Sequence, residues 1–182
     1  LLLEPGAPEP RPLLDKHRLV PLGEWLPPLP LGLTPGLSAV GGLQPGAPSR
    51  AMAGMQPSAA AAICYEISDG RALAAASAEG AQWLLAVANL DPYPRLLQRQ
   101  FTALGQLRAL ENDRDLLSVA NTGPTVLIRA NGQVQPLLPP LQDGVALAEL
   151  QPRASRTVYA RWRDVLLLSL LVVGLVRLLA SR

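Results

Sequence analysis

The chain has 182 residues, of which 49% are hydrophobic and 16% are charged, whereas about 25% are charged in an average soluble domain. Its net charge is +2, and its few aromatic residues are not interleaved with a basic stripe, which argues against a nucleic-acid partner. One cysteine and one histidine exclude an internal disulfide and a Cys/His zinc site, and we expect no metal and no cofactor. The low charge indicates that part of the surface faces a membrane.

The basic residues are strongly biased towards arginine, since fifteen are arginine and Lys16 is the only lysine. A single lysine in such a chain suggests a position that requires a compact ammonium group. The length fits one domain. The opening "LLLEPGAPEPRP" has no initiator Met, no charged leader region and no cleavage site, so we expect an internal start and hence a fragment.

The first 58 residues hold most of the 19 prolines. This density prevents long helices and central strands, and it predicts an extended loop with a short strand at residues 17–22. Disorder is the alternative, but the Leu, Val and Trp content favours a loop that packs against other parts of the protein.

A change of pattern at residue 59 predicts regular structure. Residues 58–66 are expected to form a buried strand and residues 81–90 a second one. Between them, residues 68–80 have the pattern of a helix that begins at Ser68 or Asp69 and stops at Gly80. This β-α-β unit predicts a parallel sheet.

Further elements follow in alternation. Residues 93–115 have helical spacing, residues 116–121 form a third strand, and residues 145–150 form a last one. Two strands between residues 121 and 138 flank Asn131-Gly132, a dipeptide that favours a type I′ hairpin turn. The helix is expected to bury one face, made of Leu96, Leu97, Phe101, Leu104, Leu107 and Leu110.

The tail is apolar on all sides. The uncharged run from Val165 to Val176 is followed by Arg177 and three more apolar residues, which predicts a transmembrane helix over 165–180 if that arginine reaches the headgroups. Tyr159 and Trp162 suit the membrane interface. A buried C-terminal helix is the alternative.

Cys64 lies where a predicted strand passes into a helix. A thiol there is near the positive end of the helix dipole, which favours the thiolate, although a lone cysteine after alanines is also typical of an inert core residue. Glu24 and Glu66 are candidate acids or bases, and Lys16 could stabilise an oxyanion. A dyad of Cys64 with His17 has no support in the sequence.

Three stretches follow one another in an order and spacing typical of a known family: "DKHRLVPLGEWLP", "AAAICYE" and "LRALENDRDLLSVANTG". In these blocks the chain resembles the carbon-nitrogen hydrolase (nitrilase) superfamily, and within it the apolipoprotein N-acyltransferases. The resemblance runs from about Leu13 to Tyr159-Ala160-Arg161 and the apolar tail. Short soluble nitrilases lack such a tail.

The resemblance implies a cysteine-dependent transferase. Cys64 corresponds to the nucleophile and Lys16 to the lysine that stabilises the oxyanion, with Glu24, Glu66 and Tyr65 in support. The thiolate would take a fatty acyl chain from a phospholipid as a thioester, and the amino group of a diacylglyceryl-cysteine at the N-terminus of an apolipoprotein would accept it.

The resemblance also implies an organisation. We expect an α/β fold, an incomplete nitrilase-type α-β-β-α sandwich over residues 1–152, then a juxtamembrane linker over 153–164 and a transmembrane helix over 165–180. The expected location is the bacterial inner membrane, with the catalytic domain on the periplasmic side. A simple count of arginines on the two sides of the tail gives the opposite orientation, but further helices upstream would override it.

Two departures from the family leave alternatives open. Its glutamate base should lie upstream of Lys16, and neither Glu4 nor Glu9 has the expected strand context, so we expect this piece alone to be inactive. The loop "NLDPYP" differs from the usual one in carrying Leu90 and Pro92, and we assign no role to its polar residues. A membrane-tethered amidase and a noncatalytic membrane-bound remnant are therefore alternatives.

Overall fold

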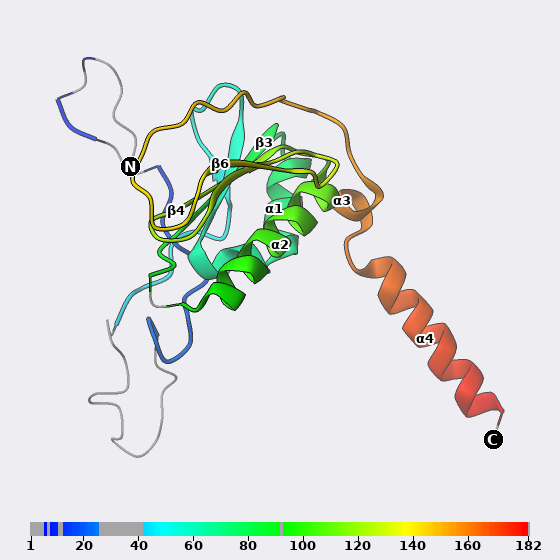
Figure 1. The fold of residues 1–182 in the computed structure, drawn as a ribbon. Coiled ribbons are helices and arrows are strands. Elements are labelled where there is room, and N and C mark those ends of the chain that lie inside the picture. Colours follow the sequence, from blue (N-terminus) through cyan, green and yellow to red (C-terminus); the bar gives the residue numbers. More distant parts are fainter. Residues whose placement is uncertain (1–5, 7, 11–12, 26–41, 92, 182) are drawn as a thin grey trace.

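The computed structural model describes residues 6, 8–10, 13–25, 42–91 and 93–181 (Figure 1). These residues form one mixed sheet of six strands in the order β1-β2-β3-β4-β5-β6, with helices packed on one of its faces. The strands are β1 (Ala51–Met52), β2 (Ala59–Ile63), β3 (Trp83–Ala88), β4 (Leu116–Ala120), β5 (Thr125–Ile128) and β6 (Val134–Leu138). The helices are η1 (Cys64–Ser68), α1 (Gly70–Ala78), α2 (Arg95–Asn112), α3 (Val158–Trp162) and α4 (Val165–Ala180).

The β2-α1-β3 unit forms as its sequence predicts. β2 and β3 pair in parallel, with Ala59 opposite Trp83, and β3 pairs in parallel with β4. The side chain of Asp69 caps α1 by accepting hydrogen bonds from two backbone amides of its first turn. Gly80 ends the helix with a φ of 115°, a conformation that glycine adopts without strain.

The outer strands are antiparallel, and one turn differs from its prediction. β4 pairs with β5 and β5 with β6 in antiparallel fashion, as expected for a hairpin around Asn131-Gly132. A type I′ turn requires positive φ at both central residues, but only Gly132 has it, at 82°. The amide of Gly132 donates to the carbonyl oxygen of Arg129 at 2.8 Å, so the turn belongs to a longer loop with glycine in the left-handed position.

Helix α2 buries a narrower face than predicted. Phe101 and Leu104 pack against the core, but Leu96, Leu107 and Leu110 are exposed, with Leu96 at 68%. The exposed leucines fall on a second stripe of the same helix. The buried stripe is made largely of small and polar residues, namely Gly105, Arg108, Ala109 and Asn112. Because Gly105 has no side chain, Ile128 of the sheet approaches the helix closely.

The second face of the sheet is covered by irregular chain. Leu13, Leu14 and Leu150 pack there against a cluster that includes Ala59 and Trp83. This confirms that the described proline-rich residues pack against the domain. The strands expected at residues 17–22 and 145–150 are wrong, because the first has only a single bridge between Pro21 and Trp25 and the second has no ladder partner. Residues 26–41 lie outside the described part.

Two buried charged residues fix the return of the chain across the sheet. Arg114 donates to the carbonyl oxygens of Ala81 and Ser155. Asp115 accepts from the Arg129 guanidinium and from the amide of Gln151. Since each side chain joins strands to the segment after residue 148, together they direct the chain back towards α3.

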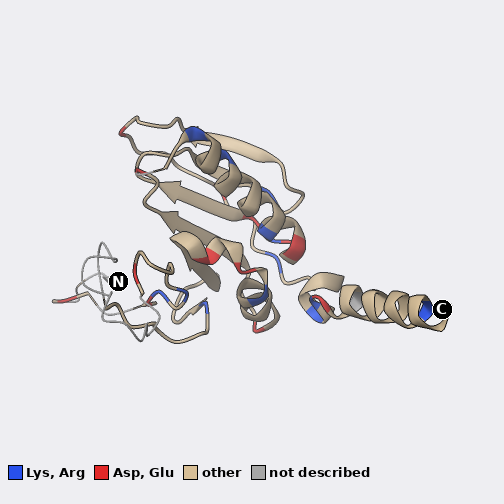
Figure 2. Cartoon of the chain, turned by 90° about the horizontal axis from the view of Figure 1, so that it is seen from below, with Lys and Arg blue, Asp and Glu red and all other residues tan. Residues whose placement is uncertain are grey.

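Helix α3 docks on α1 and α2, and α4 extends away from the body of the protein (Figures 1 and 2). Arg71 of α1 donates to Asp164, which precedes α4, at 2.5 Å. α4 has the predicted bounds, and its described apolar side chains are exposed along its length. The expected transmembrane helix is not found, since none of the helices described has both the length and the apolar composition needed to cross a bilayer.

Gly70 is the position where a side chain would disturb this docking most. A Cβ there would lie 1.7 Å from Nη1 of buried Arg108 and 2.8 Å from the hydroxyl of Tyr159. We expect Gly70→Ala to lower the free energy of unfolding by about 1–3 kcal/mol through overpacking, measured by chemical denaturation. Gly174→Ala in α4 is the control, because a Cβ there meets nothing within 4 Å. Equal stability of both variants would contradict this packing.

Candidate active site

Cys64 is presented by a sharp turn between strand and helix. It follows directly on β2 and opens η1, with a φ of 54°. This left-handed conformation is unfavourable for a residue with a side chain and persists only where its surroundings enforce it. Cys64 remains partly exposed at the carboxyl end of the parallel strands, where α/β proteins place ligand sites.

The carboxylate of Glu66 enforces this turn. Glu66 is 3% exposed, and its Oε2 accepts a hydrogen bond from the amide of Ile63 at 2.8 Å. Its Oε1 accepts from the amides of His17 at 2.6 Å and Arg18 at 3.0 Å. Nη1 of Arg50, itself 2% exposed, lies 2.9 Å from both carboxylate oxygens. Glu66 is therefore a buried, paired anion that fixes backbone, which is a different role from a free acid or base.

One consequence concerns Lys16 and Cys64. Ile63 immediately precedes Cys64, and His17 immediately follows Lys16. Because the amides of Ile63 and His17 bind the same carboxylate, the lysine loop and the cysteine turn are held together, although 48 positions separate Lys16 from Cys64 in the sequence. Arg50 reinforces the junction by donating to the carbonyl oxygen of Asp15 at 3.1 Å.

Lys16 is itself oriented by Glu24. Its Nζ lies 2.6 Å from each carboxylate oxygen of Glu24, and both side chains are largely buried. Oε2 of Glu24 also accepts from the amide of Val20 at 2.8 Å, which closes the loop between the pair. Burial alone would raise the pKa of Glu24, but the hydrogen bonds from Lys16 and Val20 and the charge of Lys16 outweigh it and lower the pKa. Glu24 is thus a charged partner of Lys16 at neutral pH.

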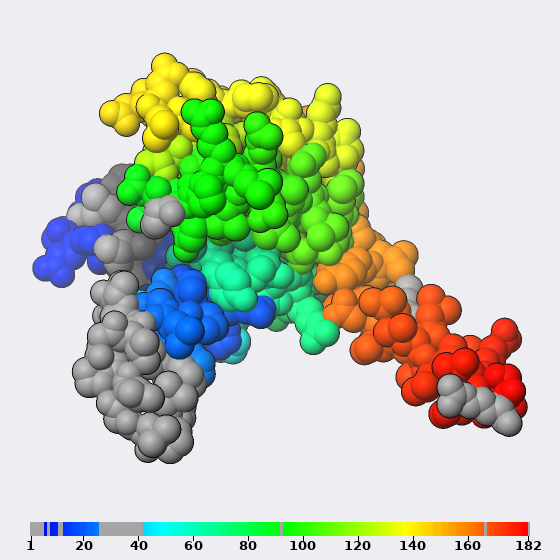
Figure 3. Space-filling model, turned by 60° about the horizontal axis from the view of Figure 1, so that its bottom comes forward, coloured from blue at the N-terminus to red at the C-terminus, as the bar shows by residue number. Residues whose placement is uncertain are grey.

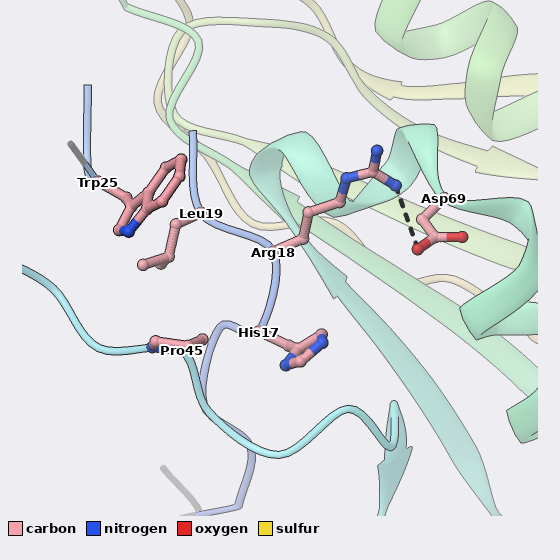
Figure 4. Close-up of a pocket in the computed structure, with 6 residues that line it drawn as sticks. All are labelled: His17, Arg18, Leu19, Trp25, Pro45 and Asp69. Carbon is pink, nitrogen blue, oxygen red and sulfur yellow. Dashed lines mark ion pairs between the residues drawn. The ribbon is translucent and has the colours of Figure 1, made fainter. Parts of the chain in front are cut away.

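Tyr65 and His17 lie at the edge of this arrangement. The Tyr65 ring is half-exposed and packs under the Arg18 guanidinium, which also pairs with Asp69 at 3.2 Å. Figure 4 shows this ion pair at a cavity of about 390 Å³ that His17 also lines. Nδ1 of His17 lies 2.7 Å from the carbonyl oxygen of Gly46, and Cys64 does not line this cavity. The structure therefore gives no support to a Cys64–His17 dyad.

The unusual loop after β3 is held by an asparagine pair. Asn121 accepts from the amide of Leu90 at 3.0 Å and donates to the side chain of Asn89 at 2.8 Å. The Leu90 side chain is buried, and a Cβ at Gly123 would lie 2.6 Å from it. Leu90, one of the residues in which this loop departs from the family, thus acts as an apolar anchor of the loop.

Sequence reasoning missed Arg50. It is one of fifteen arginines, it stands in a stretch rich in Pro and Gly, and its partner Glu66 is 16 positions away. A weak signal was available, since an arginine directly before the short apolar stretch "AMAGM" is a candidate for a buried cation. In the described part of the chain no group of three or more His, Cys, Asp or Glu side chains could hold a metal ion.

The structure thus combines a mixed α/β sheet, a cysteine at a strained strand-to-helix turn, and an oriented lysine on a loop that the Glu66 carboxylate ties to that turn. The chain belongs to the carbon-nitrogen hydrolase family, whose model matches residues 13–159.

The curated relatives that the chain matches share one more specific name, apolipoprotein N-acyltransferase. The chain is 67% identical over 161 residues to the apolipoprotein N-acyltransferase of Parasynechococcus marenigrum (strain WH8102). This alignment covers 88% of this chain and 35% of the relative. The chain is 58% identical to the apolipoprotein N-acyltransferase of Prochlorococcus marinus (strain MIT 9313), in an alignment that covers 100% of this chain and 36% of the relative. The chain thus spans about a third of the length of these curated relatives. Nit3 of Saccharomyces cerevisiae, a solved nitrilase-superfamily structure, aligns over 50% of this chain and 37% of its own, with 14% identity and a TM-score of 0.45.

The Arg50–Glu66 pair gives a first prediction for the site. Arg50→Met leaves a buried carboxylate without its cation and is expected to lower the free energy of unfolding by about 3–5 kcal/mol. Arg71→Met is the control, because its pair with Asp164 is exposed and should contribute little to stability. Adding Glu66→Gln to Arg50→Met should restore part of the loss. Equal losses in the two arginine variants, measured by chemical denaturation, would contradict the role of Arg50.

The Lys16–Glu24 pair gives a prediction of pH dependence. The lowered pKa of Glu24 means that its stabilising contribution is complete above its ordinary value of 4.5 and is lost as pH falls through the value in the folded protein. The advantage of the native protein over Glu24→Gln in free energy of unfolding should therefore shrink between pH 7 and pH 3. Glu79→Gln at an exposed position serves as the control, and a constant difference for Glu24→Gln would show that the pair does not form.

Proposed function

We propose that this chain carries the nucleophile of an apolipoprotein N-acyltransferase, with Cys64 as the residue that forms the acyl-enzyme. The observation that carries the proposal is the Glu66 carboxylate, which binds the backbone beside both Lys16 and Cys64. The names of the relatives support the reaction class. The donor is then a phospholipid and the acceptor an apolipoprotein.

In the first half-reaction the Cys64 thiolate attacks the carbonyl carbon of an ester of the phospholipid. A carbon–sulfur bond forms and the carbonyl oxygen becomes an oxyanion, which the ammonium group of Lys16 stabilises. Collapse of this intermediate breaks the ester bond. The lysophospholipid leaves as an alcohol after taking up the proton that the Cys64 thiol lost when it formed the thiolate, and the acyl chain stays on sulfur as a thioester.

In the second half-reaction the free α-amino group of the diacylglyceryl-cysteine attacks the thioester carbonyl. The carbon–sulfur bond breaks, an amide forms, and the amine proton that is released restores the thiol or leaves to solvent. The group that accepts this proton is expected to be the family's glutamate, which has no counterpart among the residues matched to the family motifs.

The remaining site residues act by positioning Lys16 and Cys64. Glu24 holds the Lys16 ammonium in place by pairing with it. Glu66 and Arg50 position the turn of Cys64. Tyr65 lies on the exposed side of that turn, where an acceptor would approach.

The apolar helix α4 suits a substrate that resides in a bilayer. Its exposed Leu and Val side chains form a continuous apolar surface of the kind that marks contact with a membrane or a partner. We assign it to the membrane, with Arg177 near its end reaching the headgroups. The domain that holds Cys64 would then stand at the bilayer surface on the periplasmic side of the inner membrane, as the family resemblance implies.

An amidase would use the same cysteine with water as acceptor. In a noncatalytic remnant the cysteine would form no thioester. Product analysis separates these functions. An N-acylated lipopeptide indicates transfer, free fatty acid or ammonia indicates hydrolysis, and a lack of any thioester indicates lost activity.

The decisive variant is Cys64→Ala in the whole product of the gene that encodes this chain. In membranes with a phospholipid donor, the native protein should gain the mass of one acyl chain at Cys64, and the variant should gain none and transfer none. Lys16→Arg should lower the rate of acylation about a hundredfold or more, because a guanidinium does not reproduce the position of the ammonium. Acyl transfer by Cys64→Ala would rule out the assignment of the nucleophile.

A further inference from the structure

A second cavity lies next to Cys64 and differs in character from the polar one of Figure 4. It has a volume of about 230 Å³, and nearly all of its wall is apolar. Cys64 lines it together with Val20, Leu97, Phe101 and Leu104. No charged side chain is among its described lining residues.

The wall of this cavity is built by the same contacts that build the site. Val20 belongs to the loop that Glu24 closes through the Val20 amide. Cys64 belongs to the turn that Glu66 fixes through Ile63. The third side is the N-terminal half of α2, and Figure 3 shows the three segments next to one another, in blue, turquoise and green. The cavity is therefore positioned by the residues that position Cys64.

We propose that this cavity binds the carboxyl-proximal part of the fatty acyl chain while the chain is attached to Cys64. The inference rests on the proposed function and names the subsite that selects the donor's chain. Its volume of 230 Å³ corresponds to about eight groups the size of a water molecule at about 30 Å³ each, so a long chain would fill it and extend beyond it.

The chemistry of the wall favours an acyl chain over the other substrate groups. A headgroup or a peptide amine placed there would lose its hydration and meet a wall that is nearly all apolar, which is unfavourable. Each methylene group of an acyl chain gains from leaving water. The polar substrate groups would lie instead on the side of Arg18 and Asp69, which line the polar cavity.

Leu97 offers a clean test because it lines the cavity, whereas its neighbour Leu96 is exposed on another face of α2. Leu97→Trp fills the cavity, Leu97→Ala enlarges it, and Leu96→Trp is the matched control. The whole gene product is placed in vesicles that contain equal amounts of phosphatidylglycerol with decanoyl and with palmitoyl chains. Intact-protein mass spectrometry then gives the ratio of the two thioesters on Cys64.

We expect Leu97→Trp to shift the ratio towards the decanoyl chain by about tenfold relative to the native protein, and Leu97→Ala to shift it the other way. Leu96→Trp should leave it unchanged. An unchanged ratio in both Leu97 variants, with thioester still formed, overturns the subsite and leaves the proposed function intact. Absence of any thioester on the native protein overturns the proposed function and the subsite with it.

Discussion

The arrangement of the site depends on the burial of one negative charge. A carboxylate that leaves water is strongly destabilising unless it is paired and hydrogen-bonded, and Glu66 meets this condition with three backbone amides and the Arg50 guanidinium. Its donors come from the lysine loop, from the end of β2 and from the segment before β1. Any conformation that separates these segments leaves the charge unpaired, so the same interaction that makes Glu66 tolerable in the core also assembles the site.

This constraint explains why a strained residue can persist where chemistry is proposed. Cys64 has a left-handed backbone conformation that its own preferences disfavour, and the hydrogen bond from the Ile63 amide to Glu66 holds the preceding peptide in place. The lysine on the facing loop is fixed by a second carboxylate, that of Glu24. Two acidic residues therefore have related but distinct roles, since Glu66 orders backbone and Glu24 orients a side chain.

The surroundings of Cys64 are divided by polarity. On one side the paired Arg18 and Asp69 line a polar cavity, and on the other Cys64 itself lines an apolar cavity against α2. Substrates that combine a long chain with a polar head match such a division. The packing of α3 on α1 and α2 adds a further element, because the apolar helix α4 follows α3 after only two residues.

Features set by neighbouring residues could be predicted from the sequence. The alanine-rich strand β2, the Asp69 cap and the Gly80 stop are local, and they formed as predicted. The hairpin around Asn131-Gly132 formed, but with a different turn type. The predictions that Leu96, Leu107 and Leu110 are buried and that residues 145–150 form a strand were wrong, because each depends on a partner elsewhere in the chain. Leucine spacing cannot indicate that the sheet would select Gly105 and Ala109 as the contact of α2.

For the site, the sequence by itself determined which residues to consider, since the blocks around Lys16, Glu24 and Cys64-Tyr65-Glu66 identify the family. Only the tertiary structure decided what Glu66 does, that Arg50 pairs with it, and that Val20 and Leu97 form one wall with Cys64. The physical reason is that a buried charge and a cavity are properties of several segments at once. Their energies depend on distances through space that local sequence patterns do not encode.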